Sequence, residues 1–123
     1  MSDASHSQAD AVSAFADKVQ RCWSRDTATT FTAQKPAFGQ CSVTALLAQH
    51  RLGGTILKTD VDGAWHFYNH VDGQRHDFTV SQFEHTIHYD DLPSSREEAM
   101  RDTSQTQYDR LASALAKLDS QLP

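Results

Sequence analysis

The chain has few cysteines, few glycines and prolines, no long apolar stretch and a deficit of positive charge. Among its 123 residues are two cysteines, and 11 lysines and arginines stand against 16 acidic residues, which leaves a net charge of −5. A nucleic-acid partner is not expected, because phosphate binding needs clustered positive charge and the basic residues are scattered. No run approaches the ~20 apolar residues of a membrane span, so we expect a soluble protein without a membrane partner.

The N-terminus also lacks the basic cluster and apolar stretch of a secretory signal peptide, which predicts a cytoplasmic protein. Thiols stay reduced in that compartment, so no disulfide is expected between Cys22 and Cys41. The length fits a single domain over residues 1–123, with residues 1–9 expected to be a disordered tail. A domain of this size can bury a core without metals or disulfides.

Two N-terminal segments have the apolar spacing of helices. In residues Ala11–Trp23 the apolar side chains recur at three- and four-residue steps, and Cys22 belongs to that stripe, which predicts a buried, inert thiol. A second helix is predicted over Gln40–Leu52, where Gly53 and Gly54 supply its stop.

Three short segments with strand character follow. They are Thr55–Thr59, Ala64–Val71 and Gln74–Val80, and the dipeptides Asp62-Gly63 and Asp72-Gly73 separate them. Asp-Gly between such runs is a strong hairpin signal, because both residues adopt positive φ at low cost. The pattern predicts an antiparallel meander of three strands.

The C-terminal part returns to a helical pattern. Ser95 and Glu98 fit a capping box, and a clean apolar stripe runs from Tyr108 to Leu122, as one helix or two. The predicted fold class is therefore α+β: N-terminal helices, one with a catalytic-type cysteine at its start, packed with a C-terminal helix on a small antiparallel sheet.

Cys41 is predicted to lie in the first turn of its helix. Helix N-termini lower the pKa of a thiol through their free N–H groups and dipole, and the thiolate is the nucleophilic form. Ala45 and Ala48 share the Cys41 side of the helix, and such small side chains allow a sheet to approach closely. We therefore expect the thiol at the seam between helix and sheet.

The second hairpin brings a histidine and an acid to one face. A two-residue turn at Asp72-Gly73 places Tyr68 opposite Asp77, so His66 and Asp77 become diagonal neighbours. With Cys41 they form a candidate triad, in which His66 takes the thiol proton and Asp77 holds the imidazole tautomer. Helix N–H groups, and the side-chain amide of Gln40, are candidate donors to an oxyanion.

Two alternatives accompany this hypothesis. Seven histidines raise the question of a metal site, but His66 and His70 would lie about 13 Å apart on a strand. His85 and His88 could share an ion if helical, yet no adequate set of further ligands stands beside them, so neither a metal nor a cofactor is expected. The other alternative is a non-catalytic binding or regulatory module on the same fold, with Trp65, Tyr68 and Phe38 as its surface.

The motifs resemble a known family. Four stretches of the sequence are similar to the YunG-like family of small bacterial proteins. They are Gly39-Gln40-Cys41-Ser42-Val43-Thr44-Ala45-Leu46-Leu47, Gly53-Gly54, Trp65-His66-Phe67-Tyr68-Asn69 and Asp72-Gly73-Gln74-Arg75-His76-Asp77-Phe78-Thr79. This resemblance covers the chain from about Trp23 to Leu115. More distantly the order of motifs resembles the core of transglutaminase-like and papain-like thiol enzymes, which by position implies Cys41, His66 and Asp77 as the triad.

Together these features predict a small thiol enzyme, a hydrolase or acyl transferase acting on amide or thioester bonds. Trp65, Tyr68 and Asn69 surround His66 in sequence and are the candidate substrate contacts. A peptide or short acyl group suits the shallow site expected of so small a domain, and the acidic balance disfavours polyanions. The sequence leaves the oligomeric state open.

Overall fold

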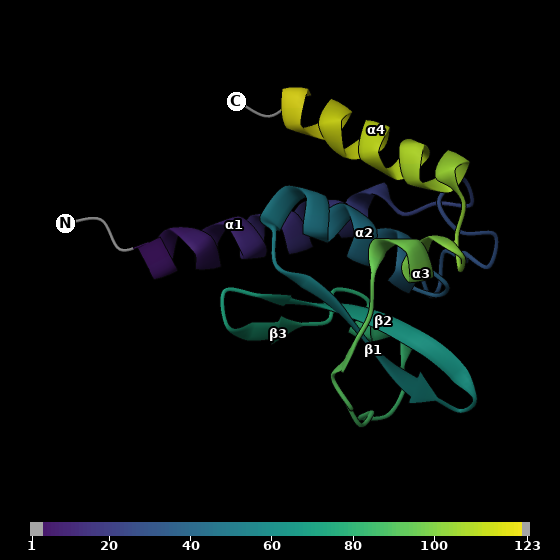
Figure 1. The fold of residues 1–123 in the computed structure, drawn as a ribbon. Helices are drawn as coiled ribbons and strands as arrows, with labels where there is room; N and C mark the ends of the chain where they lie inside the picture. The colour runs from purple at the N-terminus through teal and green to yellow at the C-terminus, as the bar shows by residue number, and fades with distance from the viewer. Residues whose placement is uncertain (1–3, 122–123) are drawn as a thin grey trace.

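The fold combines helices with a four-stranded antiparallel sheet, seen in a computed structural model that describes residues 4–121 (Figure 1). The strand order in the sheet is β3-β2-β1-β4. This arrangement confirms the predicted α+β class. The elements in chain order are α1 Ala4–Val19, α2 Cys41–Leu52, β1 Thr55–Val61, β2 Ala64–Val71, β3 Gln74–His76, β4 Leu92–Pro93, α3 Arg96–Met100 and α4 Gln105–Gln121, with short 3₁₀ turns at Gln20–Cys22 and Val80–Gln82.

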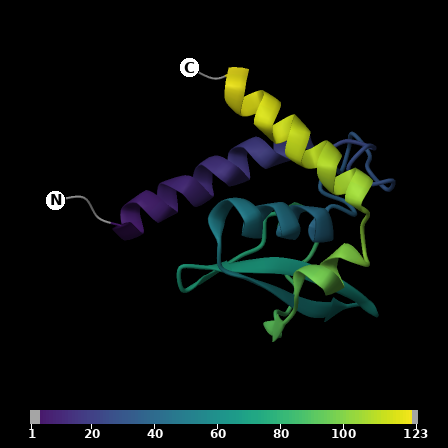
Figure 2. The same cartoon turned by 45° about the horizontal axis from the view of Figure 1, so that its top comes forward.

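Helix α2 lies between the sheet and an outer layer made by α1 and α4 (Figures 1 and 2). Toward α1 and α4 it packs through Val43 and Leu47, and toward the sheet through Ala45 and Leu46. Every residue from Cys41 to Ala48 is consequently buried. A helix enclosed in this way needs apolar or hydrogen-bonded side chains all round.

Two buried hydrogen bonds join α2 to its neighbours. Trp23 Nε1 donates to Thr44 Oγ1 at 2.9 Å, which satisfies both groups inside the core. Asn69 Nδ2 on β2 donates to the Ala45 carbonyl at 3.0 Å and ties the sheet to the helix. The helix ends as predicted, where Gly53 adopts φ +79° and its N–H donates to Gln49 O at 2.9 Å.

Both predicted hairpins form. Val61 pairs with Ala64 and Val71 with Gln74, across turns in which Asp62 and Asp72 have positive φ. Strand β3 nevertheless ends at His76, so the prediction of a strand up to Val80 is wrong beyond that point. Asp77 Oδ1 accepts from the Thr79 N–H at 3.2 Å, and this turn leads the chain away from the sheet.

The two ends of the chain differ from the sequence prediction. Helix α1 begins at Ala4, so residues 4–9 are helical where a tail was predicted, while residues 1–3 lie outside the described residues. Alanine and glutamine favour the helix there, and Gln8 Nε2 reaches Leu52 O at 3.4 Å. At the other end the chain forms two helices, and α3 has the predicted cap, in which Ser95 Oγ accepts from the Glu98 N–H.

Strand β4 was not predicted, since it spans two residues and contains Pro93. It pairs antiparallel with β1 at the sheet edge, where a proline is tolerated. Both cysteines are free thiols, as predicted. No helix within residues 4–121 has the length and apolar character needed to cross a bilayer.

Candidate functional site

His66 and Asp77 form a buried pair. His66 Nε2 lies 2.7 Å from Asp77 Oδ2, and their side chains are 3% and 5% exposed. The hairpin register that predicts this pair is confirmed by the pairing of Asn69 with His76, which leads directly to Asp77. Because Nε2 faces the carboxylate, the neutral imidazole carries its proton there and leaves Nδ1 as an acceptor.

Asp77 has further donors besides His66. The Tyr89 hydroxyl donates a hydrogen bond to Asp77 Oδ2 at 2.7 Å. The other carboxylate oxygen accepts from the N–H of Thr79 at 3.2 Å and from its hydroxyl at 3.4 Å. Such a set of donors compensates the burial of a carboxylate.

The pair lies on the face of the sheet opposite α2. Side chains alternate along a strand, and the α2-facing residues of β2 are Phe67 and Asn69, so His66 points the other way. The segment that follows β3 covers it there. The Phe83 ring meets the imidazole edge-on at 4.7 Å between centroids.

Cys41 is the first residue of α2, as predicted, and its sulfur meets the edge of β2. The backbone N–H groups of Phe67 and Ser42 are close enough to the sulfur to favour its thiolate form. Residues at odd positions of β2 direct their N–H groups toward β3, but β3 ends opposite Asn69. The N–H of Phe67 is therefore free of the strand ladder and available to the thiol.

The sequence predicted a lowered thiol pKa, and the structure corrects this. Burial raises the pKa of Cys41 to about 11, and the carboxylates of Asp102 and Asp77 act in the same direction. The N–H groups of Phe67 and Ser42 lower it by less. Desolvation thus outweighs the helix N-terminus, and Cys41 rests as a neutral thiol at neutral pH.

The three predicted triad residues come together only in part. Cys41 borders Phe67, the neighbour of His66 along β2, and Asp77 is close enough to raise its pKa. Within residues 4–121, however, the hydrogen bonds of the His66 ring run to Asp77 and not to Cys41. Among the described residues, the thiol and the imidazole therefore make no direct bond.

Gln40 points its side chain into the preceding loop. It is fully buried; its Oε1 accepts from the Thr27 hydroxyl at 2.8 Å, and its Nε2 donates to Ser24 O at 3.4 Å. The structure therefore shows Gln40 holding the loop of residues 24–40 against the start of α2. Its predicted role as an oxyanion donor stays a prediction.

The predicted substrate contacts differ in exposure. Trp65 is 46% exposed, and Lys58 Nζ lies 4.2 Å above its ring. Tyr68 and Asn69 are buried, so their placement differs from that of a surface contact. The Tyr68 hydroxyl accepts from the Asp91 N–H and donates to its carboxylate, while Asn69 holds the sheet to α2.

The remaining histidines show no ligand cluster. Among residues 4–121 no group of three or more histidine, cysteine or acidic side chains is placed to hold a metal ion. His85 and His88 belong to a segment without helix, and His88 pairs at the surface with Asp90 at 3.0 Å.

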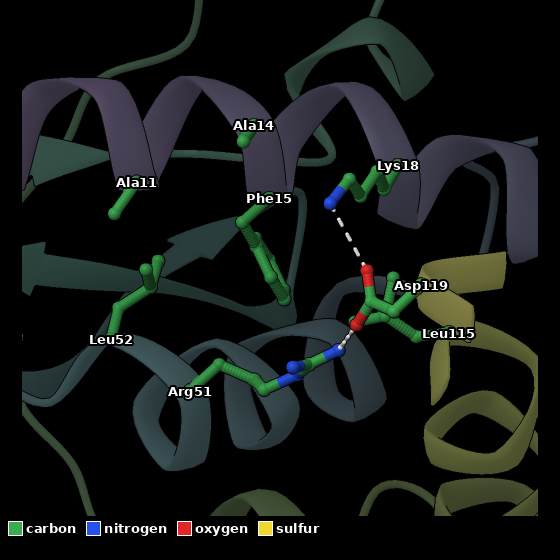
Figure 3. A pocket seen from close by; sticks show the side chains of 8 residues that line it. All are labelled: Ala11, Ala14, Phe15, Lys18, Arg51, Leu52, Leu115 and Asp119. Atoms are coloured by element: carbon green, nitrogen blue, oxygen red, sulfur yellow. Dashed lines mark hydrogen bonds and ion pairs between the residues drawn. The ribbon is translucent and has the colours of Figure 1, made fainter. Parts of the chain in front are cut away.

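A pocket of about 420 Å³ lies elsewhere, between α1, α4 and the end of α2 (Figure 3). Phe15, Leu52 and Leu115 are among the apolar residues that line it. Asp119 stands at its rim with Lys18 at 3.0 Å and with Arg51. Arg51 is ten residues from Cys41 along the helix, about 15 Å, so this pocket is separate from the thiol.

Comparison with known proteins places the chain in a family. Residues 11–119 match the family described as YunG protein. The chain belongs to the YunG family. Over 99 residues it is 48% identical to the protein named YunG from Bacillus subtilis (strain 168), an alignment that covers 80% of this chain and 86% of that protein. No solved structure matches the chain.

The YunG family match includes all the elements of the site, from α2 to the end of the segment that covers His66. Two residues of this site, Phe83 and Tyr89, are not indicated by any sequence pattern. Both lie in an irregular segment without periodicity, where no local pattern indicates which side chains turn inward. The sequence hinted only at Thr79, since a threonine two residues after an aspartate is typical of a side-chain-capped turn.

Proposed function

We propose that this YunG family member is a cysteine-dependent hydrolase or acyl transferase acting on amide or thioester bonds. The observation that supports it is a buried His66–Asp77 pair, 2.7 Å apart, next to the strand residue whose N–H meets the Cys41 sulfur. A nucleophile, a base and a group that orients the base are the minimum set for acyl transfer through a covalent intermediate. The papain-like relationship is part of this proposal.

In the first half-reaction the Cys41 thiol transfers its proton to His66 Nδ1 as the sulfur attacks the acyl carbon. For this step the sulfur has to leave the Phe67 N–H and approach the imidazole, whose side chain points to the face of the sheet opposite α2. The carbonyl oxygen becomes an oxyanion that backbone N–H groups at the start of α2 receive. The carbon–nitrogen or carbon–sulfur bond then breaks, and His66 returns the proton to the departing amine or thiol.

In the second half-reaction a water or an acceptor amine attacks the Cys41 thioester. His66 takes a proton from the attacking group, the carbon–sulfur bond breaks, and the proton returns to the sulfur. The products are a carboxylic acid or a new amide, and the free thiol. Asp77 keeps its hydrogen bond to His66 Nε2 throughout and so holds the imidazole in place for both steps.

Two cavities adjoin residues around the buried pair, although neither is lined by Cys41 or His66. One, of about 410 Å³, is lined by Asp77 itself, and the other, of about 620 Å³, by Phe83, which covers His66. The second cavity also contains Asp60, Asp62 and Glu84 in its lining. Because carboxylates outnumber the single lysine there, we expect a neutral or cationic peptide or a short acyl group.

Labelling with an acyl-activated probe, such as a small thioester, tests the function. Intact mass spectrometry should detect one adduct, localised to Cys41 by peptide mapping. In His66→Gln the labelling rate should fall by about 100-fold or more, because general base catalysis contributes factors of that size. Glutamine keeps a polar side chain beside Asp77, which limits the loss of stability caused by removing a buried hydrogen-bond partner.

Matched variants separate this result from unspecific reactivity. Cys22→Ser should label like the wild type, whereas Cys41→Ser should not label, and circular dichroism reports whether each variant is folded. Equal labelling of wild type and His66→Gln would contradict a base role for His66. Absence of labelling in both would contradict the enzymatic proposal.

A second candidate function is a non-catalytic binding module, and one observation favours it. Cys41 is 8% exposed with a raised pKa, which is typical of a structural thiol, while Phe38 and Trp65 are 47% and 46% exposed. Exposed aromatic side chains are common in recognition surfaces. On this alternative Phe38→Ala and Trp65→Ala would impair function and Cys41→Ala would not.

A further inference from the structure

We infer that Tyr89 is a positioning residue for His66, acting through Asp77, and that the segment of residues 77–91 is a strap anchored to hold it there. The inference deepens the proposed function, since it concerns the same imidazole, but the contacts that carry it are independent of any reaction. Nothing in the sequence pattern around Tyr89 marks it for this role.

Tyr89 and His66 share one carboxylate oxygen. The Tyr89 hydroxyl donates to Asp77 Oδ2 at 2.7 Å, and His66 Nε2 lies 2.7 Å from the same atom. Thr79 supplies donors to the other oxygen. Tyr89 and Thr79 thus hold the carboxylate of Asp77 at both of its oxygens. This orients the carboxylate for its contact with the His66 imidazole.

The Tyr89 hydroxyl keeps its proton under the conditions in which the site would work. Burial raises the pKa of Tyr89, and the hydrogen bond to Asp77 raises it further. The hydroxyl is therefore a donor to the carboxylate and never a competing anion. A carboxylate that receives this additional hydrogen bond is a weaker acceptor for the His66 N–H.

The end of the strap is anchored at Asp91. This residue has φ +55°, an uncommon conformation for a side chain other than glycine, and two groups of the sheet hold it. Tyr68 exchanges hydrogen bonds with its N–H and carboxylate at 2.8 and 2.9 Å, and Arg75 Nε donates to the carboxylate at 2.8 Å.

The same two residues also contact the Tyr89 ring. The Tyr68 ring meets it edge-on at 4.9 Å, and the Arg75 guanidinium lies 4.5 Å from its centroid. The half-buried ring is thus contacted from both β2 and β3, while its hydroxyl bonds to Asp77. Strand residues thereby fix a side chain that is far from them in the chain.

The test is Tyr89→Phe, which removes one oxygen and keeps the packed ring. Two readouts are recorded: the pH profile of acyl-probe labelling at Cys41, and the NMR signal of the His66 Nε2 proton in ¹⁵N-labelled protein. Tyr108→Phe is the matched control, because that ring packs near Arg96 and against both core clusters and takes no part in the hydrogen bonds of His66 and Asp77 within residues 4–121.

In Tyr89→Phe, Asp77 loses a donor and binds the protonated imidazole more tightly. The part of the labelling rate that His66→Gln abolishes should therefore reach half of its maximum at a pH about 0.5–1 unit higher, the equivalent of one hydrogen bond. The His66 Nε2 proton signal should move downfield. Tyr108→Phe should leave both readouts at their wild-type values.

The outcomes separate this inference from the proposed function. If the wild type does not label, the proposed function fails, and the NMR signal alone decides the role of Tyr89. If Tyr89→Phe leaves the signal and the half-maximal pH where they are in the wild type, the inference is overturned. A uniform loss of labelling without a change in either readout also overturns it, since packing alone would explain that loss.

Discussion

Alkylation of Cys41 by iodoacetamide should accelerate about 1000-fold between pH 7 and pH 10, with no plateau in that range. Burial raises the pKa of this thiol to about 11, and only the thiolate reacts. Below the pKa the thiolate fraction grows tenfold for each pH unit, so three units give a factor of about 1000. The measurement is the rate of mass gain over a series of pH values.

The experiment is best done in Cys22→Ser, so that every adduct reports Cys41. Burial also raises the pKa of Cys22, and its reaction would otherwise overlap with that of Cys41. The tyrosines of the site keep their protons up to pH 10, because burial raises the pKa of both Tyr68 and Tyr89. A plateau reached below pH 9 would show that helix N–H groups stabilise the thiolate more than burial destabilises it.

This pH dependence bears directly on the proposed mechanism. A thiol with a pKa of about 11 does not supply a standing thiolate, so at neutral pH the attack on an acyl carbon requires His66 to accept the proton in the same step. At neutral pH the resting thiol should accordingly react only slowly with electrophiles that do not engage His66. Reactivity would depend on a substrate that displaces the sulfur from the Phe67 N–H and brings it to the imidazole.

Gly54→Ala should lower the free energy of unfolding by about 3–5 kcal/mol, much more than the neighbouring Gly53→Ala. Both glycines have positive φ, which costs other residues about 1–3 kcal/mol. At Gly54 an added Cβ would also lie 2.1 Å from the carbonyl oxygen of His70, a backbone atom of β2 that cannot move without distorting the hairpin. Overpacking of this kind adds about 1–3 kcal/mol.

Gly53→Ala is the matched control, because a Cβ at Gly53 meets no atom within 4 Å and only the backbone strain remains. Urea denaturation followed by circular dichroism compares the two variants. A domain of this size has about 5–15 kcal/mol of stability in total, so Gly54→Ala should leave little margin. Equal losses in the two variants would contradict a close contact between the end of α2 and β2.

Local signals in the sequence account for the helix that carries Cys41 and for the hairpin that pairs His66 with Asp77. The apolar spacing and the paired glycines define α2, and the Asp-Gly turn sets the register of β2 and β3. Both are short-range effects, governed by backbone conformations within a few residues. The registered hairpin alone places the imidazole and the carboxylate on one face.

Tertiary structure decided what surrounds these residues. Tyr89 reaches Asp77, and Phe83 covers His66, from a segment that has no periodic pattern and takes its conformation from contacts with the sheet. Strand β3 ends at His76, before the predicted Val80, because the Asp77 carboxylate accepts a hydrogen bond from the Thr79 N–H and the chain turns away from the sheet there. A propensity for strand formation up to Val80 is overridden by that one turn.

The sequence by itself determined the α+β class, the position of Cys41 at a helix start and the His66–Asp77 pairing, because each depends on the order of residues along short stretches of chain. Only the tertiary structure decided the protonation of Cys41. The sequence contains the helix N-terminus, which lowers the pKa of a thiol, but not the enclosure of α2 between the sheet and the outer helices. That enclosure removes water from the thiol, and desolvation outweighs the helix N–H groups.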